Sequence, residues 1–140
     1  MLAAGDDGRP VGIAIAYPPE RWPPPVRSFW HEAWGVGLAG PGAALRGLRA
    51  TGALDAAHPA EPHLFLHTLG VDPPNQRSGA GGALLEHLID TAGPGVLIHL
   101  TTSAPDNLPY YGRFGFELDG EATLPRGVPL WSMLRPPASP

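Results

Sequence analysis

A polar, glycine-containing loop lies between two apolar segments in the middle of the sequence. It reads Val-Asp-Pro-Pro-Asn-Gln-Arg-Ser-Gly-Ala-Gly over residues 71–81 and leads into a stretch with helical periodicity. The first amides of a helix have no partner within the helix, and the positive end of the helix dipole lies behind them, so a phosphate can bind there. Gly79 and Gly81 would let such an anion approach the backbone. The alternative is an ordinary turn between a strand and a helix.

Two familiar phosphate-binding loops are excluded by the residues that surround these glycines. No Gly-Lys-Ser/Thr follows the loop, so it is not of the Walker type. The segment Gly79-Ala80-Gly81 lacks the third glycine in register that a dinucleotide-binding fingerprint requires.

The histidines offer two candidate metal pairs, and neither fits a metal site. His63 and His67 would share a strand face, but four residues of strand separate them by about 13 Å. His31-Glu32 is not followed by the second histidine that a zinc protease needs. We therefore predict that the protein uses no metal.

Apolar periodicity and turn residues predict the elements that position the loop. Their order indicates an α/β fold with a mixed sheet. The predicted strands span residues 2–4, 11–17, 64–71, 96–100, 116–123 and 128–134, and the predicted helices span residues 29–38, 44–48, 79–92 and 107–113.

Length and composition narrow the class of protein. A chain of 140 residues with a hydrophobic fraction of 43% is expected to fold as one domain, residues 1–140, with a flexible tail at residues 136–140. The net charge is -4, and no basic stripe exists to neutralise phosphates, which excludes a general nucleic-acid binder. Cysteine is absent, so disulfides and thiolate chemistry are excluded. The sequence has no long apolar run, and we expect a cytoplasmic protein that does not bind membranes.

Two motifs resemble those of the GCN5-related N-acyltransferase (GNAT) family. Residues 76–81, Gln-Arg-Ser-Gly-Ala-Gly, match the family pattern Gln/Arg-x-x-Gly-x-Gly/Ala, and a strand ending Leu-x-Val-x-Pro precedes them. Residues 107–116, Asn-Leu-Pro-Tyr-Tyr-Gly-Arg-Phe-Gly-Phe, resemble the family's Asn-x-x-Phe-Tyr-x-x-x-Gly-Phe. The two occur in the family's order, with one predicted strand between them. The resemblance is strong over residues 64–116 and weaker to residue 134.

The resemblance implies a fold and an activity. The expected fold is a mixed, mostly antiparallel sheet with a central parallel pair of strands that splay apart, flanked by helices. The expected activity is transfer of an acetyl or other acyl group from acetyl-CoA to the primary amine of a small molecule, by direct attack in a ternary complex. A protein amine is a further acceptor that the family allows, and a homodimer is a further expectation.

The resemblance also implies roles for individual residues. Tyr111 would act as the general acid that protonates the departing thiolate. Tyr110 takes the family's usual phenylalanine position, where a structural role is expected. Asn107 would hydrogen-bond near the pantetheine or its sulfur. The remaining cofactor contacts would come from the backbone of Leu69, Gly70, Val71, Gln76, Arg77, Ser78, Gly79, Ala80 and Gly81.

His67 is the candidate base or water relay for the incoming amine, because histidine titrates near neutral pH. Serotonin N-acetyltransferase resembles this stretch, with a histidine at the same offset. The alternative is a structural histidine. Strand alternation predicts two faces. One face would hold His63, Phe65, His67 and Leu69, and the other Leu64, Leu66 and Thr68.

The chain also departs from the family pattern. Members normally begin with a strand and two helices that form a wall of the acceptor pocket, and about 50 residues of that pattern have no counterpart here, judged by the resemblance. We therefore expect an N-terminally short GNAT domain. The alternative function is a coenzyme A-binding module or degenerate homologue without turnover, and a third, distant alternative is an unrelated α/β domain.

Overall fold

The computed structural model describes residues 1–5, 8–19, 49–50 and 52–138. The helices predicted at residues 29–38 and 44–48 lie outside these residues. The described residues 49–50 and 52–56 are helical. The elements in chain order are β1 (Leu2–Ala4), β2 (Pro10–Tyr17), β3 (Leu64–Val71), the 3-10 turn η3 (Pro73–Asn75), α3 (Ala80–Ala92), β4 (Ile98–Thr102), α4 (Asn107–Gly112), β5 (Glu117–Leu124), the 3-10 turn η4 (Pro125–Gly127) and β6 (Val128–Arg135).

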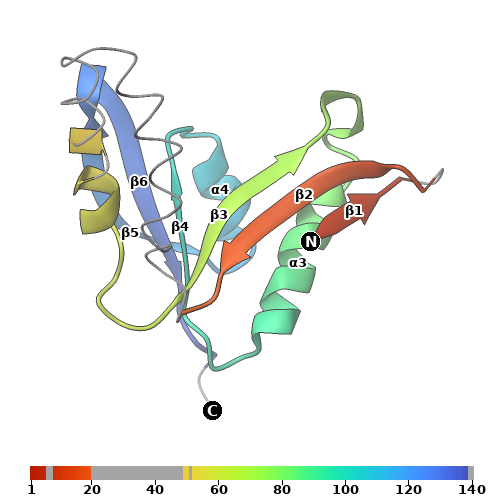
Figure 1. Ribbon diagram of the computed structural model, residues 1–140, viewed down its shortest axis with the longest axis horizontal. Coiled ribbons are helices and arrows are strands. Elements are labelled where there is room, and N and C mark those ends of the chain that lie inside the picture. The colour runs from red at the N-terminus through yellow and green to blue at the C-terminus, as the bar shows by residue number, and fades with distance from the viewer. Residues whose placement is uncertain (6–7, 20–48, 51, 139–140) are drawn as a thin grey trace, which may run out of the picture.

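A six-stranded sheet with the order β1-β2-β3-β4-β6-β5 forms the centre of the molecule (Figure 1). The pair β3–β4 is parallel, and the other neighbouring strands are antiparallel. This arrangement confirms the predicted mixed, mostly antiparallel sheet. The strands predicted at residues 2–4 and 11–17 are also present, and they form a hairpin in which β1 and β2 pair and the amide of Gly8 donates to the carbonyl of Gly5.

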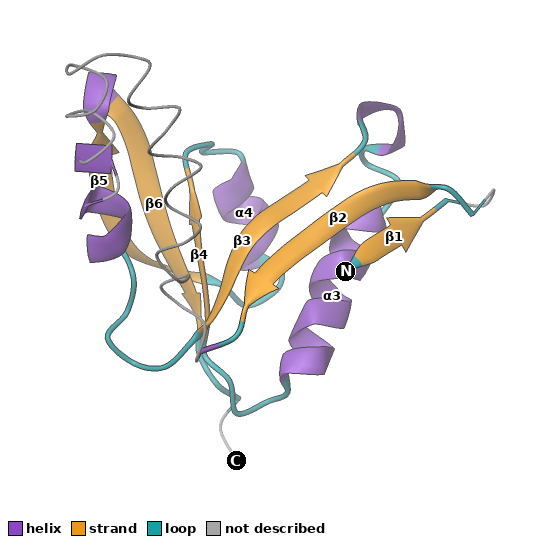
Figure 2. Cartoon of the chain, in the orientation of Figure 1, coloured by secondary structure: helices purple, strands orange, loops and turns teal. Residues whose placement is uncertain are grey.

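Helix α3 covers the β1–β3 half of the sheet on one face (Figure 2). It starts after Gly79, whose φ of 94° favours glycine, and it ends at Gly93, where φ is 86°. Leu84, Leu85 and Leu88 fall on one side of the helix, as its periodicity predicts, and are buried against the sheet.

The core lies on the α3 side of the sheet. Apolar side chains from strands and both helices meet there and remove each other from water, which is the main stabilising term in a domain of this size. Its buried members are Ala14, Leu66, Leu84, Leu85, Leu88, Ile98, Leu100, Tyr111, Phe116 and Met133.

The opposite face of the β3–β4–β6 region carries a second, partly polar group. The ring of Phe65 stacks on that of His99, with centroids 5.4 Å apart, and the ring of His58 lies 4.4 Å from Phe65. Burial, reinforced by the neighbouring histidines, lowers the pKa of His58 to about 4 and that of His99 to about 3. These rings are therefore neutral at physiological pH.

Strand β3 contains a bulge, and the predicted alternation fails there. Ile15 of β2 pairs with Thr68, but the next residue, Ala16, pairs with Leu66, so His67 is an extra residue on β3. At a bulge two successive side chains point to one side, and the Nδ1 of His67 lies 2.8 Å from the Oγ1 of Thr68. Thr68 therefore joins the His67 face, and Leu69 packs against the core on the α3 face. Both assignments correct the sequence-based faces.

The C-terminal half follows its predicted elements with small shifts. The strand predicted at residues 96–100 spans Ile98–Thr102, because residues 94–97 are taken up by the turn after α3. Beyond β6, the amide of Ala138 donates to the carbonyl of Pro94 at 2.7 Å, and residues 139–140 lie outside the described part of the chain. None of the described helices has the length and apolar character needed to cross a membrane.

Candidate active site

The two parallel strands separate in the middle of the sheet. Leu64, Phe65 and Leu66 pair with β4, and no later residue of β3 pairs with β4 in the described structure. From His67 onward β3 diverges from β4, as Figure 1 shows, while its other edge continues to pair with β2 through Val71. The facing edge of β3 at residues 69–71 is thus available to an extended ligand, in the way that an exposed strand edge accepts an added strand. The predicted splayed pair is present.

The loop between β3 and α3 is shaped by its own hydrogen bonds. The side-chain amide of Gln76 donates to the carbonyl of Val71 at 3.2 Å, and the hydroxyl of Ser78 donates to the carbonyl of Asn75 at 2.6 Å. Arg77 adopts a positive φ of 63°, which is uncommon for a residue other than glycine. These contacts turn the chain so that Gly79 and the first turn of α3 follow directly.

The two predicted loop glycines serve different purposes. Gly79 has a positive φ, and an added Cβ would meet nothing within 4 Å, so its side is open to a ligand. At Gly81 an added Cβ would lie 3.0 Å from the hydroxyl of Tyr110 and 3.4 Å from the Cγ2 of Val71. A side chain at Gly81 would therefore have to displace the hydroxyl of Tyr110 by a few tenths of an ångström, a close contact that the sequence alone did not reveal.

Tyr111 extends from α4 into the core. Only 9% of its surface is exposed, and its ring contacts those of Phe116 and Tyr110 at centroid distances of 5.8 and 5.3 Å. Burial, and secondarily the neighbouring Tyr110, raises the pKa of Tyr111 above its usual value of 10.0. The phenol consequently keeps its proton at any physiological pH and can only donate it.

Tyr110 lies at the surface side of the same helix. The guanidinium of Arg113 stands over its ring, with the central carbon 5.1 Å from the centroid. Its contacts with Gly81 and with the ring of Phe114, 5.4 Å away, join α4 to the start of α3. These are packing contacts, in line with the structural role expected for it.

Asn107 fixes the start of α4 to the end of β4. Its side-chain amide donates to the Oγ1 of Thr102 at 2.9 Å, and the amide of Ala104 donates to the same oxygen at 3.3 Å. Thr102 is buried and was not selected by sequence reasoning, because a threonine at the end of a strand gives no signal of its own. The contact holds the Asn107 carbonyl beside the strand that borders the gap.

His67 lies on the face of the sheet opposite α3. Its ring is exposed and meets those of Tyr17 and Phe65 edge-on, at centroid distances of 5.6 and 5.8 Å. Tyr111 belongs to the core on the α3 face. The two candidate catalytic side chains thus lie on opposite faces of the sheet.

A cavity of about 350 Å³ lies on the same face as His67, next to the histidines of β3 and β4. His58 lines it, and the ring of His58 is linked to His67 through the intervening ring of Phe65. Residues 119–122 of β5 also line this cavity, and Asp119 is the acidic residue among them that the strand register does not turn to the opposite face, where Glu121 lies beside Trp131. Sequence reasoning missed the cavity, because its walls come from the helix at residues 52–56 and from β5 and β6.

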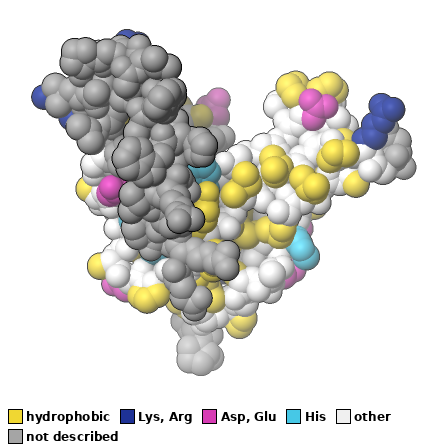
Figure 3. Space-filling view, in the orientation of Figure 1, with side chains coloured by type: hydrophobic (Ala, Val, Ile, Leu, Met, Phe, Trp, Pro, Cys, Tyr) yellow, Lys and Arg dark blue, Asp and Glu magenta, His cyan; other side chains and the backbone are white. Residues whose placement is uncertain are grey.

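On the same face, described residues of β1 and β2 carry exposed apolar side chains. Apolar side chains gather there in Figure 3, and those of Leu2, Ile13 and Ile15 are exposed by 68%, 39% and 39%. Because Ile15 pairs with Thr68, this apolar strip continues toward His67.

The sheet with its splayed parallel pair and glycine-containing helix start defines the acetyltransferase class of fold. The family model described as the acetyltransferase (GNAT) family matches residues 1–116. The chain belongs to this family.

Solved structures of similar fold agree with this assignment. A Corynebacterium glutamicum protein described as histone acetyltransferase HPA2 and related acetyltransferase is 29% identical, with a TM-score of 0.68 over 99% of this chain. The chain spans 64% of that protein's length. A polyamine N-acetyltransferase from Drosophila melanogaster has a TM-score of 0.64 at 19% identity, covering 95% of this chain and 72% of its own. An agmatine N-acetyltransferase has a TM-score of 0.65 at 20% identity, covering 95% and 73%. The similarity to the polyamine and agmatine N-acetyltransferases is a similarity of fold alone.

Proposed function

We propose that the protein transfers an acetyl group from acetyl-CoA to a primary amine of a small molecule. The observation that carries the proposal is the gap between β3 and β4, with a candidate acid on one face of the sheet and a candidate base on the other. The amine nitrogen would attack the thioester carbonyl directly, the carbon–sulfur bond would break, and coenzyme A would leave as a thiol. No covalent enzyme intermediate is required, in keeping with the absence of cysteine from the sequence.

The coenzyme would bind along β3 and the start of α3. Its pantetheine would hydrogen-bond to the backbone of residues 69–71 as an added strand, because this edge has no partner on β4. Its pyrophosphate would meet the backbone amides of residues 76–81, where the dipole of a 13-residue helix favours an anion. Asn107, held by Thr102, would contact the sulfur end.

Tyr111 would protonate the departing thiolate. The buried, uncharged environment that raises the pKa of its phenol keeps the proton available until the carbon–sulfur bond breaks. His67, on the other face, would take a proton from the incoming ammonium group, directly or through water. Their placement on opposite faces of the sheet supports this division, because the nitrogen that loses a proton and the sulfur that gains one are two different atoms of the tetrahedral intermediate.

The acceptor is proposed to be a cationic amine that enters on the His67 face. Asp119 at the neighbouring cavity would favour a second positive charge on the acceptor. Two proteins of similar fold are described as acting on polyamines and agmatine, which agrees with such a molecule. A protein amine is the second candidate, since the Corynebacterium protein is described as a histone acetyltransferase relative. Residues 1–140 would act as a single domain.

A thiol-release assay with acetyl-CoA and a panel of amines tests the proposal. We expect thiol release that depends on the amine, with diamines and agmatine preferred over neutral monoamines. Binding of coenzyme A without amine-dependent release for any amine would support the alternative, a coenzyme-binding module without turnover. Failure to bind coenzyme A would contradict both.

A further inference from the structure

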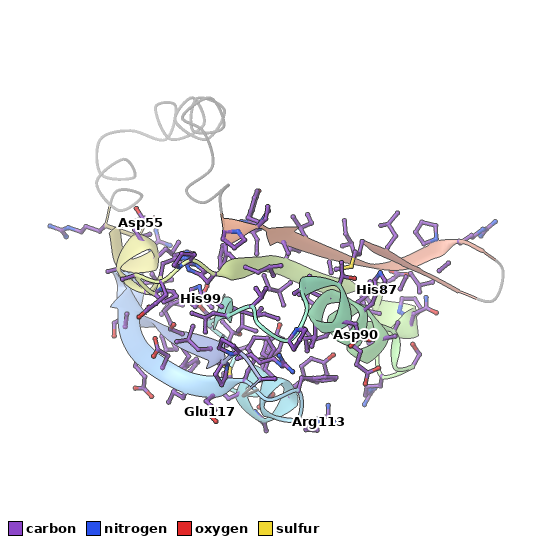
Figure 4. All side chains as sticks on the ribbon, turned by 90° about the horizontal axis from the view of Figure 1, so that it is seen from below. Asp55, His87, Asp90, His99, Arg113 and Glu117 are labelled. Atoms are coloured by element: carbon purple, nitrogen blue, oxygen red, sulfur yellow. The ribbon has the colours of Figure 1, made fainter. Side chains whose placement is uncertain are left out.

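Three histidines from different parts of the chain meet on the face of the sheet opposite α3. His58 follows the helical residues 52–56, His63 precedes β3, and His99 lies in β4. Each offers one ring nitrogen, and these nitrogens lie within 4.8 Å of one another. The ring of His99 is 4.5 Å from that of His58 and 5.3 Å from that of His63. In Figure 4 His99 lies close to the helix that carries Asp55.

Hydrogen bonds fix which nitrogen of His63 carries the proton. Its Nδ1 lies 2.8 Å from the carbonyl oxygen of Glu61, and a carbonyl only accepts, so the Nδ1 is the donor. The Nε2 of His63 then carries a lone pair. It faces the Nδ1 of His58 at 2.9 Å.

The same reasoning fixes His99. The hydroxyl of Ser132 donates to the carbonyl of Ala57 at 3.1 Å, so its oxygen accepts from the Nε2 of His99 at 3.0 Å. The Nδ1 of His99 is left with a lone pair. The side chain is fully buried, and this nitrogen has no hydrogen-bond partner within the described residues. A buried acceptor without a partner is unfavourable unless a donor or a cation meets it.

We propose that His58, His63 and His99 bind a divalent transition-metal ion, and that Zn²⁺ fits them best. Imidazole nitrogens are preferred ligands of zinc, and three of them with one open position form a known type of zinc coordination. Metal-binding histidines usually donate their second N–H to a carbonyl or another oxygen, as His63 and His99 already do. Because the other nitrogen of each ring donates, the Nε2 of His63 and the Nδ1 of His99 both have a lone pair that can bind a metal ion.

Only small side-chain movements separate this arrangement from a tetrahedral one. Ligand nitrogens about 2.0 Å from zinc stand roughly 3.3 Å apart in a tetrahedron, compared with 2.9 Å between His58 and His63 and at most 4.8 Å within the group. His58 must bind through a lone pair on Nδ1, so its proton would reside on Nε2 in the metal-bound form. This shift is between two neutral tautomers and changes no net charge.

The surroundings favour a cation. Asp119 lines the cavity that His58 and Ser132 also border, and its negative charge would partly offset that of the ion. The bound ion would fasten the end of the helical residues 52–56 to β4 and to the start of β3. This role is independent of the acetyltransferase activity proposed above.

Metal binding by the purified full chain tests the proposal. The chelator-treated protein is titrated with Zn²⁺ by calorimetry and with Co²⁺, whose visible absorption reports a tetrahedral site. The variants are His58→Ala, His63→Ala, His99→Ala and Ser132→Ala. His87→Ala is the matched control, because His87 is an exposed histidine of α3 remote from His99 (Figure 4). Circular dichroism identifies variants that fold.

We expect the wild type and His87→Ala to bind one equivalent of Zn²⁺ and to show tetrahedral Co²⁺ absorption. Folded histidine variants should bind at least about 100-fold more weakly, and Ser132→Ala about 10- to 100-fold more weakly, because it loses only the oxygen that orients His99. Zn²⁺ should raise the unfolding temperature of the wild type and not that of His58→Ala. If His99→Ala does not fold, His58→Ala decides, because its side chain is only half-buried. Absence of one-to-one binding by the wild type, or unchanged affinity in His58→Ala, would overturn the proposal.

Discussion

At the scale of single residues, the adjacent Tyr110 and Tyr111 are the same residue type but have different environments. Tyr111 is buried among apolar rings, and its raised pKa keeps the phenol protonated. Tyr110 stands at the surface side, where Arg113 and the start of α3 hold it. The family resemblance separated their roles because Tyr110 occupies a position where phenylalanine is usual, and their observed burial is compatible with that separation.

Replacement of Tyr111 by phenylalanine should lower turnover by about 10²- to 10⁴-fold, the usual contribution of general acid catalysis. Binding of acetyl-CoA should be retained, because only the hydroxyl is lost. Steady-state kinetics and a binding titration measure the two effects. Tyr110→Phe, the same change one residue away, is the control and should change turnover by less than about threefold. Equal turnover in Tyr111→Phe and the wild type would exclude Tyr111 as the acid.

The pH dependence of the same reaction follows from the direction of the Tyr111 shift. An acid must be protonated to act, and a pKa raised above 10.0 keeps the phenol protonated as the pH rises to that value. We therefore expect no alkaline loss of turnover from Tyr111 below about pH 10. A fall in turnover between pH 8 and 9.5 that Tyr111→Phe abolishes would contradict this expectation.

His67 is proposed to act in its neutral form, so turnover should be lost when acid protonates the base. The variant His67→Gln retains hydrogen bonding to Thr68 but does not titrate, so the acidic limb of its pH–rate profile should flatten or shift. His87→Gln serves as the control for loss of a histidine elsewhere. An acidic limb that is the same in His67→Gln and in the wild type would assign proton removal to another group or to solvent.

At the scale of elements, the loop before α3 was predicted well and the strand before it only in part. The start and end of α3 could be predicted because each depends on a local residue type, Gly79 at the start and Gly93 at the end. Its apolar side could be predicted from the helical spacing of the leucines. The bulge at His67 was missed, because strand alternation assumes one residue opposite one residue. Where the pairing gains a residue, as at His67, every later residue of β3 changes face. The bulge also lies next to Leu66, the last residue of β3 that pairs with β4.

The anion site at the start of α3 can be tested with a pair of nearly identical side chains. Gly79→Asp should weaken binding of acetyl-CoA strongly, since it puts a negative charge where phosphate oxygens are proposed to lie. Gly79→Asn introduces a side chain of the same shape without the charge, and asparagine tolerates a positive φ. We expect about tenfold or more between the dissociation constants of the two variants, measured by calorimetry at low salt. Gly95→Asp, at the far end of α3, controls for added charge; equal affinities for Gly79→Asp and Gly79→Asn would argue against the anion site.

At the scale of the whole molecule, the fold brings together three histidines from different parts of the chain. The His58, His63 and His99 side chains come from a helix end, a strand start and the middle of another strand, so no spacing rule connects them. Along one strand, His63 and His67 are too far apart to bind the same metal ion. Strand spacing does not predict that His58 and His99, from other elements, lie next to His63. The cavity bordered by Asp119 was missed for the same reason. Local motifs thus predict the loop and helix where the coenzyme is proposed to bind, while the cavity and the three histidines depend on tertiary contacts.

If the coenzyme binds in the gap between β3 and β4, it should also stabilise the folded state of the whole domain. A coenzyme that bridges the edge of β3, the start of α3 and the α4 region would bind the folded state and not the unfolded one. At a concentration of 100 times its dissociation constant, such a ligand stabilises the folded state by about 2.7 kcal/mol. For a domain of this size the unfolding temperature should rise by about 10 °C. Differential scanning fluorimetry of the wild type and of two variants measures this rise.

Tyr111→Phe and Gly79→Asp test whether the rise in unfolding temperature depends on the proposed coenzyme site. Tyr111→Phe should retain the full rise in unfolding temperature although its turnover is low, because the acid is needed only when the carbon–sulfur bond breaks. Gly79→Asp should lose most of the rise at the same ligand concentration, because its dissociation constant is higher. A wild-type protein whose unfolding temperature does not change with saturating acetyl-CoA would refute the bridging arrangement. A rise that is equal in Gly79→Asp and in the wild type would place the coenzyme away from the start of α3.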